Sequence, residues 1–257
     1  MPQLGFGTYL SPPDLALKSC LTALQAGYRH IDTAQYYQNE AEVGEAIRQS
    51  GLAREDVFVT TKVLTPGDGP EATYAACLES VEKIGGSNGY VDCFLIHSPN
   101  VGEAKRREMW LALERLHREG KARAIGTSNF GKGQIEGLRG VGEVWPPHVN
   151  QIEREIVQYC RDSGIVVQAY CPIVRNQKAD DPTLVGIAKR HGVTPNQVLI
   201  RWSLQKGWVS LPKSDNPDRI RLNCDAFGFD LNADDEKLLD GLDQGAAGGL
   251  VQTVNNE

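Results

Sequence analysis

Short apolar runs rich in β-branched residues recur along the chain and alternate with longer amphipathic stretches. Runs of about 4 to 8 such residues, bounded by turn residues, are typical of strands buried in a parallel sheet. The pattern predicts eight strands, at Leu4–Thr8, Tyr28–Thr33, Val57–Val63, Val91–His97, Ala124–Ser128, His148–Ile152, Ile165–Tyr170 and Val209–Pro212.

The stretches between these runs carry apolar residues at helical spacing. In the first stretch the residues near one face are Leu15, Leu17, Leu21 and Leu24, and Gly27 follows as a stop signal. Thr194 precedes Pro195, which is the usual order of an N-cap and a first helical residue. The predicted helices are Asp14–Ala26, Glu40–Gln49, Pro70–Ile84, Lys105–Glu119, Arg154–Ser163, Pro182–His191 and Pro195–Gln205.

The alternation of strands and helices predicts parallel βαβ units. Eight units in 257 residues fit a (β/α)8 TIM barrel better than a doubly wound sheet. We expect a single barrel domain that spans residues 1–257. A doubly wound sheet normally binds a dinucleotide through G-x-G-x-x-G after its first strand, but here Gly5 and Gly7 are followed by Leu10. The chain also lacks a G-x-x-x-x-G-K-[ST] phosphate loop.

Composition argues against several classes of protein. The formal net charge of −6 argues against nucleic-acid binding, which needs a basic face. No apolar run approaches the roughly 20 residues that span a bilayer, and the N-terminus lacks the pattern of a secretory signal. The six cysteines form no C-x-x-C pair, so we expect no metal site and a reducing, cytoplasmic compartment.

Polar residues close nearly every predicted strand. Active sites of (β/α)8 barrels lie at the C-terminal ends of the strands, so we expect Asp32, Lys62 and His97 to converge. The plainer interpretation is a structural ion pair beside a core histidine. The other polar residues expected at this end are Thr8, Ser128, Asn129, Asn150, Gln151, Tyr170, Lys213 and Ser214.

An acid, a lysine and a histidine, with Tyr37 five residues beyond Asp32, suggest proton transfer to a carbonyl oxygen. Tyrosine, with a reference pKa near 10, is a poor proton donor at neutral pH. A lysine cation about 4 Å away favours the phenolate by on the order of 4 kcal/mol at an effective dielectric constant of 20, and desolvation offsets part of this. We therefore expect Lys62 to lower the pKa of Tyr37, Asp32 to hold Lys62, and a neutral His97 to orient the carbonyl.

Six short segments follow one another along the chain. They are YRHIDTAQYY (28–37), FVTTK (58–62), LIHSP (95–99), IGTSNF (125–130), VNQIE (149–153) and LPKS (211–214). Together they resemble the aldo-keto reductase family, and the resemblance runs from Pro2 to about Leu231. It implies a (β/α)8 barrel that reduces aldehydes and ketones with NADPH. The short His-Ser-Pro segment is similar to the microbial and fungal branch of the family.

The resemblance implies a role for each matching residue. It assigns Asp32, Tyr37, Lys62 and His97 to a catalytic tetrad in which Tyr37 is the proton donor. The positions that match contacts to the nicotinamide are Ser128, Asn129, Gln151 and Tyr170, and Thr8 matches a backbone-proximal position near the cofactor. The positions that match contacts to the 2′-phosphate and adenine are Lys213, Ser214, Asn216, Arg219 and Asn223.

The chain also departs from the family pattern. Asp215 places an acid beside the expected phosphate pocket, where it can pair with Arg219 or repel the 2′-phosphate. Leu222 stands where many members carry a glutamate that contacts adenine. Aromatic residues that are common in the substrate pocket of animal members are replaced, which implies a more open pocket, at Tyr9, Leu64 and Ser98.

These observations predict a cytoplasmic carbonyl reductase that takes a small carbonyl substrate and uses NADPH/NADP+, with NADH possible but weaker. We expect a monomer or weak dimer with no nucleic-acid or membrane partner. One alternative is a cofactor-binding regulatory subunit of a membrane channel, with little turnover. Another is a barrel hydrolase or isomerase that uses no nicotinamide.

The junction after the sixth predicted strand is unusually tight. The strand ends near Gln151–Glu153 and the next helix is expected from Arg154, although a βα connection usually takes about 2–6 residues. We therefore predict that Glu153 and Arg154 are not consecutive in the natural chain and that an active-site loop belongs between them.

Overall fold

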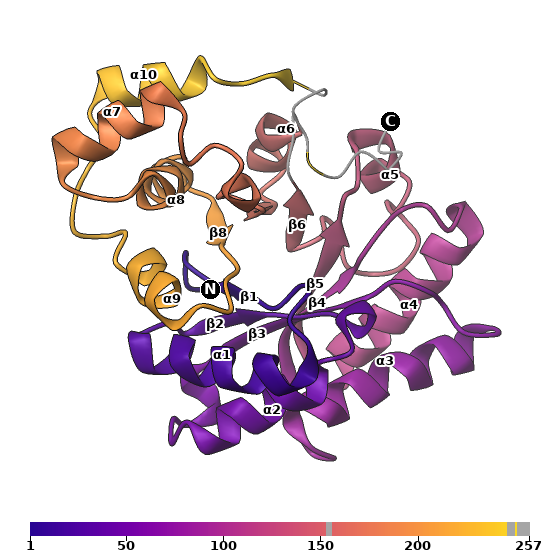
Figure 1. Ribbon diagram of the computed structural model, residues 1–257. Helices are drawn as coiled ribbons and strands as arrows, with labels where there is room; N and C mark the ends of the chain where they lie inside the picture. Colours follow the sequence, from indigo (N-terminus) through magenta and orange to yellow (C-terminus); the bar gives the residue numbers. More distant parts are fainter. Residues whose placement is uncertain (153–155, 246–249, 251–257) are drawn as a thin grey trace.

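In the computed structural model, which describes residues 1–152, 156–245 and 250, eight strands form one sheet in chain order (Figure 1). Each strand pairs in parallel with the next. The strands are β1 (Phe6–Gly7), β2 (His30–Asp32), β3 (Phe58–Val63), β4 (Val91–Ile96), β5 (Ala122–Ser128), β6 (Val149–Ile152), β7 (Val166–Tyr170) and β8 (Val209–Leu211). All eight predicted strands are therefore confirmed.

The N-terminal segment closes the ring between β8 and β1. Leu4 and Ser210 form a parallel bridge, and the Gly5 amide donates to the Ser210 carbonyl at 2.8 Å. The Ser210 amide donates in turn to the Gln3 carbonyl at 2.7 Å. Eight parallel strands alternating with helices and closed in this way confirm the predicted (β/α)8 barrel.

Helices surround the ring of strands (Figure 1). They are α1 (Pro13–Ala26), α2 (Glu40–Gln49), α3 (Pro70–Gly85), α4 (Glu103–Arg118), α5 (Lys132–Glu136), α6 (Val157–Asp162), α7 (Pro182–His191), α8 (Pro195–Gln205), α9 (Pro217–Cys224) and α10 (Ala233–Asp240). The 3-10 turns are η1 (Gln35–Tyr37), η2 (Arg54–Asp56) and η3 (Val174–Asn176). The sequence pattern predicted α2, α7 and α8 with these bounds but did not predict α5, α9 or α10.

The predicted junction between Glu153 and Arg154 lies outside the described residues, which resume at residue 156. Helix α6 begins at Val157, three residues later than the predicted start at Arg154.

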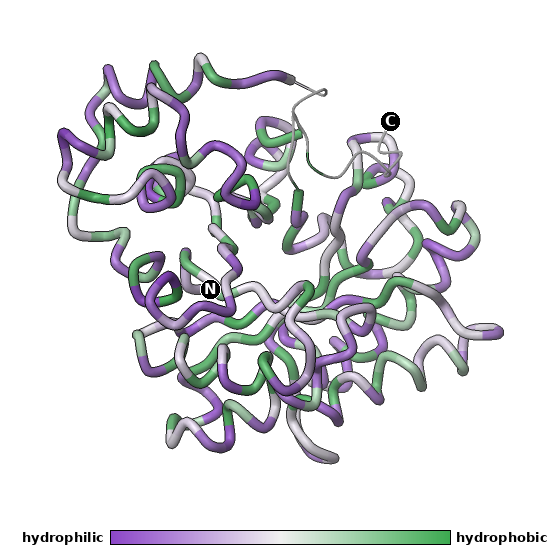
Figure 2. The backbone as a smooth tube through the Cα atoms, in the orientation of Figure 1, coloured by the Kyte–Doolittle hydropathy of each residue, from purple (hydrophilic) through white to green (hydrophobic). Residues whose placement is uncertain are grey.

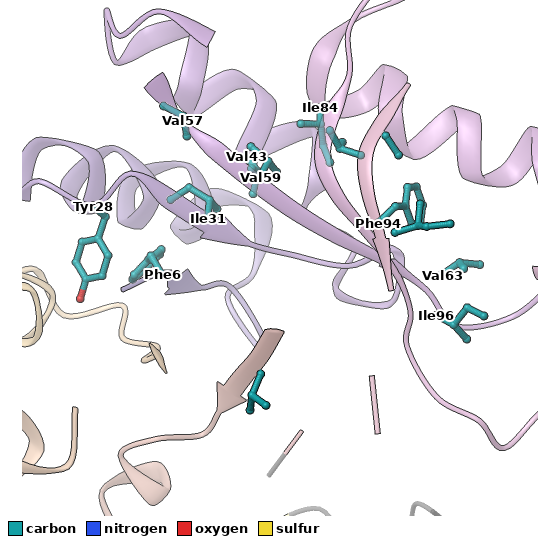
Figure 3. Close-up of a cluster of buried hydrophobic side chains, with 14 of the residues drawn as sticks. Phe6, Tyr28, Ile31, Val43, Val57, Val59, Val63, Ile84, Phe94 and Ile96 are labelled. Atoms are coloured by element: carbon teal, nitrogen blue, oxygen red, sulfur yellow. The ribbon is translucent and has the colours of Figure 1, made fainter. Parts of the chain in front are cut away.

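Alternation along each strand separates two apolar layers. Outward-facing side chains such as Ile31, Val59 and Phe94 are fully buried against the helices (Figure 3). Along the helices, hydrophobic and hydrophilic residues alternate (Figure 2). Burying a side chain of this size stabilises the fold by roughly 1.5–3 kcal/mol. Inside the ring, a smaller apolar cluster contains Leu95 and Val149.

Within the described part of the chain, no helix has the length and apolar character needed to cross a bilayer. All six cysteines are free thiols. Burial raises the pKa of Cys77 to about 12, so this side chain acts as a small apolar group.

Candidate active site

A cavity of about 780 Å³ opens where the C-terminal ends of the strands meet. Its walls include segments that follow β1, β2, β3, β4, β7 and β8 together with the last residues of β5 and β6. Asp32, Tyr37 and His97 line it, whereas Lys62 is fully buried behind the wall. The expected convergence of these side chains is therefore observed.

Lys62 lies at the centre of a buried polar cluster. Its ammonium donates to Asp32 Oδ1 at 2.6 Å, to the Thr33 carbonyl oxygen at 3.0 Å and to Tyr37 Oη at 3.3 Å. Burial lowers the pKa of Lys62, and the Asp32 carboxylate opposes this shift. All three ammonium hydrogens have acceptors, so the cation is held in one position.

Tyr37 ends the turn η1, and its ring lines the cavity. An ammonium can only donate, so Tyr37 Oη accepts from Lys62 and the phenolic hydrogen remains available to another acceptor. Burial raises the pKa of Tyr37 well above its ordinary value, and the negative charge of Asp32 adds to the shift. This direction is opposite to the one expected from the lysine charge, because burial disfavours the charged phenolate.

His97 directly follows β4 and is held by its backbone, whose amide donates to the Val63 carbonyl at 2.8 Å. Its ring meets the Tyr37 ring edge-on, with the centroids 5.6 Å apart. Burial lowers the pKa of His97 to about 3, and the Lys62 charge adds to this shift. A neutral imidazole at neutral pH agrees with the expectation from the sequence, and it carries one N–H donor.

A chain of hydrogen bonds runs from Asp32 down the inside of the barrel. Gln151 Nε2 donates to Asp32 Oδ2 and to Gln168 Oε1, both at 2.8 Å. Gln168 Nε2 lies 3.5 Å from Thr60 Oγ1, which lies 2.9 Å from His30 Nε2. Because both hydrogens of the Gln151 amide are used, its carbonyl oxygen is the atom left to contact a ligand in the cavity.

Ser128 and Asn129 form the next part of the wall. The Asn129 backbone has a φ of 63°, a left-handed conformation that asparagine tolerates well. Its side-chain Nδ2 donates to the His97 carbonyl oxygen at 3.0 Å and to Ser128 Oγ at 3.1 Å, and its Oδ1 accepts from Tyr170 Oη at 2.9 Å. The tight bend thus ties the ends of β5 and β7 to the loop after β4.

The far end of the cavity is lined by residues that follow β8. Lys213, Ser214, Asp215, Arg219 and Asn223 all contribute to it. Lys213 forms an ion pair with Asp215, and Arg219 Nε lies 3.4 Å from Ser214 Oγ. This end therefore carries two cations and one acid.

The residues expected in the substrate pocket, Tyr9, Leu64 and Ser98, line the cavity. Two expected cofactor contacts do not. Thr8 is fully buried and its hydroxyl donates to the Asp32 carbonyl oxygen at 3.0 Å, whereas Asn216 caps the N-terminus of α9.

Sequence reasoning missed several residues of the site. Asn39 is fully buried, and its amide donates to the Thr8 and Ser11 carbonyl oxygens, both at 3.0 Å, which ties the loops after β1 and β2 together. A further set follows β7 or begins α8, and its position after a strand was the available signal. These additional wall residues are Cys171, Ile173, Arg175, Asn176 and Asn196.

Comparison with known proteins agrees with this geometry. The profile of the Aldo/keto reductase family matches residues 3–244. The chain is 40% identical over 252 residues to a glyoxal reductase of Bacillus subtilis, covering 95% of this chain and 90% of that protein. It is 41% identical over 254 residues to an uncharacterized oxidoreductase of Schizosaccharomyces pombe, with 95% and 90% covered.

Solved structures show the same likeness. An aldo-keto reductase from a Medee basin deep-sea metagenome superposes with a TM-score of 0.92 at 36% identity, covering 100% of this chain and 96% of that one. An aldo/keto reductase from Brucella melitensis gives 0.89 at 39% identity, with 95% of both chains covered. The barrel, the Asp32–Lys62–Tyr37 cluster and these relatives show that the chain is an oxidoreductase and belongs to the aldo/keto reductase family.

Proposed function

We propose that the chain catalyses the NADPH-dependent reduction of small aldehydes and ketones to alcohols, with Tyr37 as the proton donor. The proposal is carried by the contact of Lys62 Nζ with both Asp32 and Tyr37 beside a cavity that His97 also lines. A structural ion pair accounts for the Asp32 contact. It does not account for a tyrosine hydroxyl and a neutral imidazole that share one cavity wall.

The side chains along the cavity fit a nicotinamide dinucleotide in their chemistry. The hydroxyl and amides of Ser128, Asn129 and Gln151 suit a carboxamide, and the nearby Tyr170 ring offers a flat apolar face. At the other end, Lys213 and Arg219 suit phosphate groups. We propose that these residues hold NADPH, which when bound supplies the hydride for the carbonyl carbon, and that NADH binds more weakly.

The contacts of Tyr37 indicate how the proton reaches the substrate. The phenolic hydrogen, left available by Lys62, is donated to the carbonyl oxygen of the substrate and is transferred as negative charge develops there. Lys62 then stabilises the phenolate through its existing bond to Tyr37 Oη, and Asp32 holds Lys62 in place. The neutral imidazole of His97 donates its N–H to the same carbonyl oxygen and orients it.

The cavity wall favours small and varied substrates. The positions expected to contact substrate are Tyr9, Leu64 and Ser98, of which only Tyr9 is aromatic, and all three line the cavity. The similar protein of Bacillus subtilis is named for the reduction of glyoxal. Both observations support a small aldehyde or dicarbonyl compound as substrate.

The test is a screen in which the full-length protein is mixed with NADPH and a series of carbonyl compounds. Consumption of NADPH with glyoxal or another small aldehyde, but not with the Tyr37→Phe variant, is the expected result. Tight binding of NADPH without turnover of any compound would favour the regulatory-subunit alternative. Failure to bind either nicotinamide cofactor would contradict the proposal.

A further inference from the structure

Asp215 is anchored at the adenosine end of the cavity by side chains from a distant part of the chain. Its Oδ1 accepts from Ser11 Oγ at 2.6 Å and from Ser19 Oγ at 3.0 Å. Both serines are almost completely buried, so the two hydroxyls hold the carboxylate in a fixed position. The other oxygen, Oδ2, forms the ion pair with Lys213.

This anchoring keeps the Asp215 carboxylate charged and Lys213 paired with it. Partial burial opposes ionisation, but the hydrogen bonds from Lys213, Ser11 and Ser19 lower the pKa of Asp215 below its ordinary value. Arg219 differs from Lys213, since it has no ion-pair partner among the residues that the structure describes. The two cations beside Ser214 are therefore unequal.

NADPH and NADH differ at this end of the molecule, where one carries a 2′-phosphate and the other a 2′-hydroxyl. A neighbouring cation strengthens the binding of a phosphate, and a neighbouring carboxylate weakens it. A ribose hydroxyl, in contrast, can donate a hydrogen bond to a carboxylate. We propose that Asp215 determines the coenzyme preference of this enzyme, by holding Lys213 in an ion pair that competes with the 2′-phosphate of NADPH and so permits the use of NADH. The inference rests on the proposed function, because it assumes that the cavity holds a nicotinamide dinucleotide.

The substitution Asp215→Asn tests this directly. Asparagine keeps a carbonyl oxygen for Ser11 and Ser19 but cannot form the ion pair, so Lys213 becomes available to phosphate. We expect the ratio of the NADH to the NADPH dissociation constant to rise about tenfold, which corresponds to about 1.4 kcal/mol. The measurement is a binding titration of each cofactor with the full-length protein.

Asp218→Asn is the matched control. Asp218 lies three residues away in α9. Among the described residues it pairs with the exposed Arg221 alone, and it is not part of the cavity wall. The control removes the same charge, so it reports any general electrostatic effect on the cofactors. We expect its ratio of dissociation constants to stay within about twofold of the unsubstituted protein, since exposed pairs contribute little.

A double-substitution cycle isolates the competition itself. If Lys213 is engaged by Asp215, Lys213→Met weakens NADPH binding little in the unsubstituted protein and more strongly in the Asp215→Asn background. Equal losses in both backgrounds would show that Asp215 does not compete for Lys213. This comparison measures binding and does not depend on turnover.

Two fragments separate failure of this inference from failure of the proposed function. Adenosine 2′,5′-bisphosphate and adenosine 5′-monophosphate differ only by the 2′-phosphate. A gain in affinity confined to the bisphosphate in Asp215→Asn supports the inference. Binding of both fragments and both cofactors with an unchanged preference overturns the inference alone. If none of the four ligands binds, the proposed function is overturned and the inference with it.

Discussion

Two adjacent tyrosines line the cavity, but Lys62 Nζ lies within hydrogen-bond distance of only one hydroxyl, that of Tyr37. Tyr36 is 60% exposed, and its ring lies 6.3 Å from that of His97. We therefore expect Tyr37→Phe to lower the rate of carbonyl reduction at least about 100-fold, the usual scale of general acid catalysis, with little change in NADPH affinity. Steady-state rates and a binding titration measure the two effects separately.

Tyr36→Phe is the matched control for that substitution, since it removes the same atom from the neighbouring residue. We expect it to keep most of the activity. A Tyr36→Phe variant that is crippled while Tyr37→Phe remains active would show that the proton donor is wrongly assigned.

Of the two cations at the end of the cavity that follows β8, Lys213 is paired with Asp215. Arg219 forms no ion pair with a carboxylate among the described residues. We expect Arg219→Ala to weaken NADPH binding roughly 10- to 150-fold, because hydrogen bonds to a charged group stabilise by about 1.5–3 kcal/mol. NADH should lose much less, since it lacks the 2′-phosphate. Arg221→Ala, two residues further along α9 and paired with Asp218, is the control, and equal losses for both cofactors after Arg219→Ala would rule out a contact with the 2′-phosphate.

At the scale of single elements, helix α8 shows a local signal that the structure confirms. Thr194 Oγ1 accepts from the Gln197 amide at 3.3 Å, and Gln197 Oε1 accepts from the Thr194 amide at 3.0 Å. We expect Thr194→Ala to lower the free energy of unfolding by about 0.5–2 kcal/mol, the usual cost of losing an N-cap. Urea denaturation measures the change, and activity at low temperature should persist.

Thr194→Ser keeps the capping hydroxyl and is expected to retain most of the stability. If the alanine and serine variants were equally destabilised, the hydroxyl bond would not be the cause, and the loss would be attributed to packing of the threonine methyl group.

The helices that the sequence pattern did not predict are short and contain few apolar residues. Helix α5 has only five residues, and the first turn of α10 carries three consecutive acids, Asp234, Asp235 and Glu236. Helix α9 did carry a readable signal, since Asn216 and Pro217 repeat the order of N-cap and first-turn proline seen at α8. Its polar composition concealed that signal, and its helical form depends on packing against α1 and α8.

At the scale of the whole molecule, the sequence predicted those features that depend on neighbours along the chain. The strand ends placed Asp32 and His97 correctly, because parallel strands bring their C-terminal ends to one edge. Contacts between distant segments could not be read in this way. The bonds from Ser11 to Asp215 and from Gln151 to Asp32 join residues 204 and 119 positions apart, and no local pattern marks them.

Two buried histidines link the stability of the molecule to pH. Burial lowers the pKa of His30 and of His97 to about 3, from an ordinary value of 6.5. Between these values the unfolded chain binds a proton at each histidine and the folded chain does not, so stability rises with pH. Lowering the pH from 7 to 5 is therefore expected to cost about 2 kcal/mol per histidine, at 1.36 kcal/mol per pH unit below 6.5.

His30→Gln isolates one of these contributions without altering the cavity wall. His30 is fully buried on β2, with Nε2 2.9 Å from Thr60 Oγ1, and glutamine can still bond to that hydroxyl. Burial raises the pKa of Glu40, so protonation of Glu40 at lower pH stabilises the fold and opposes the effect of the histidines. Glu40 is present in both proteins, so its contribution cancels in the comparison. Urea denaturation at pH 7 and pH 5 should show a loss of stability about 2 kcal/mol smaller in the variant than in the unsubstituted protein. Comparing each protein with itself across pH removes the effect of the substitution on absolute stability, and equal losses in the two proteins would show that His30 is not the titrating group.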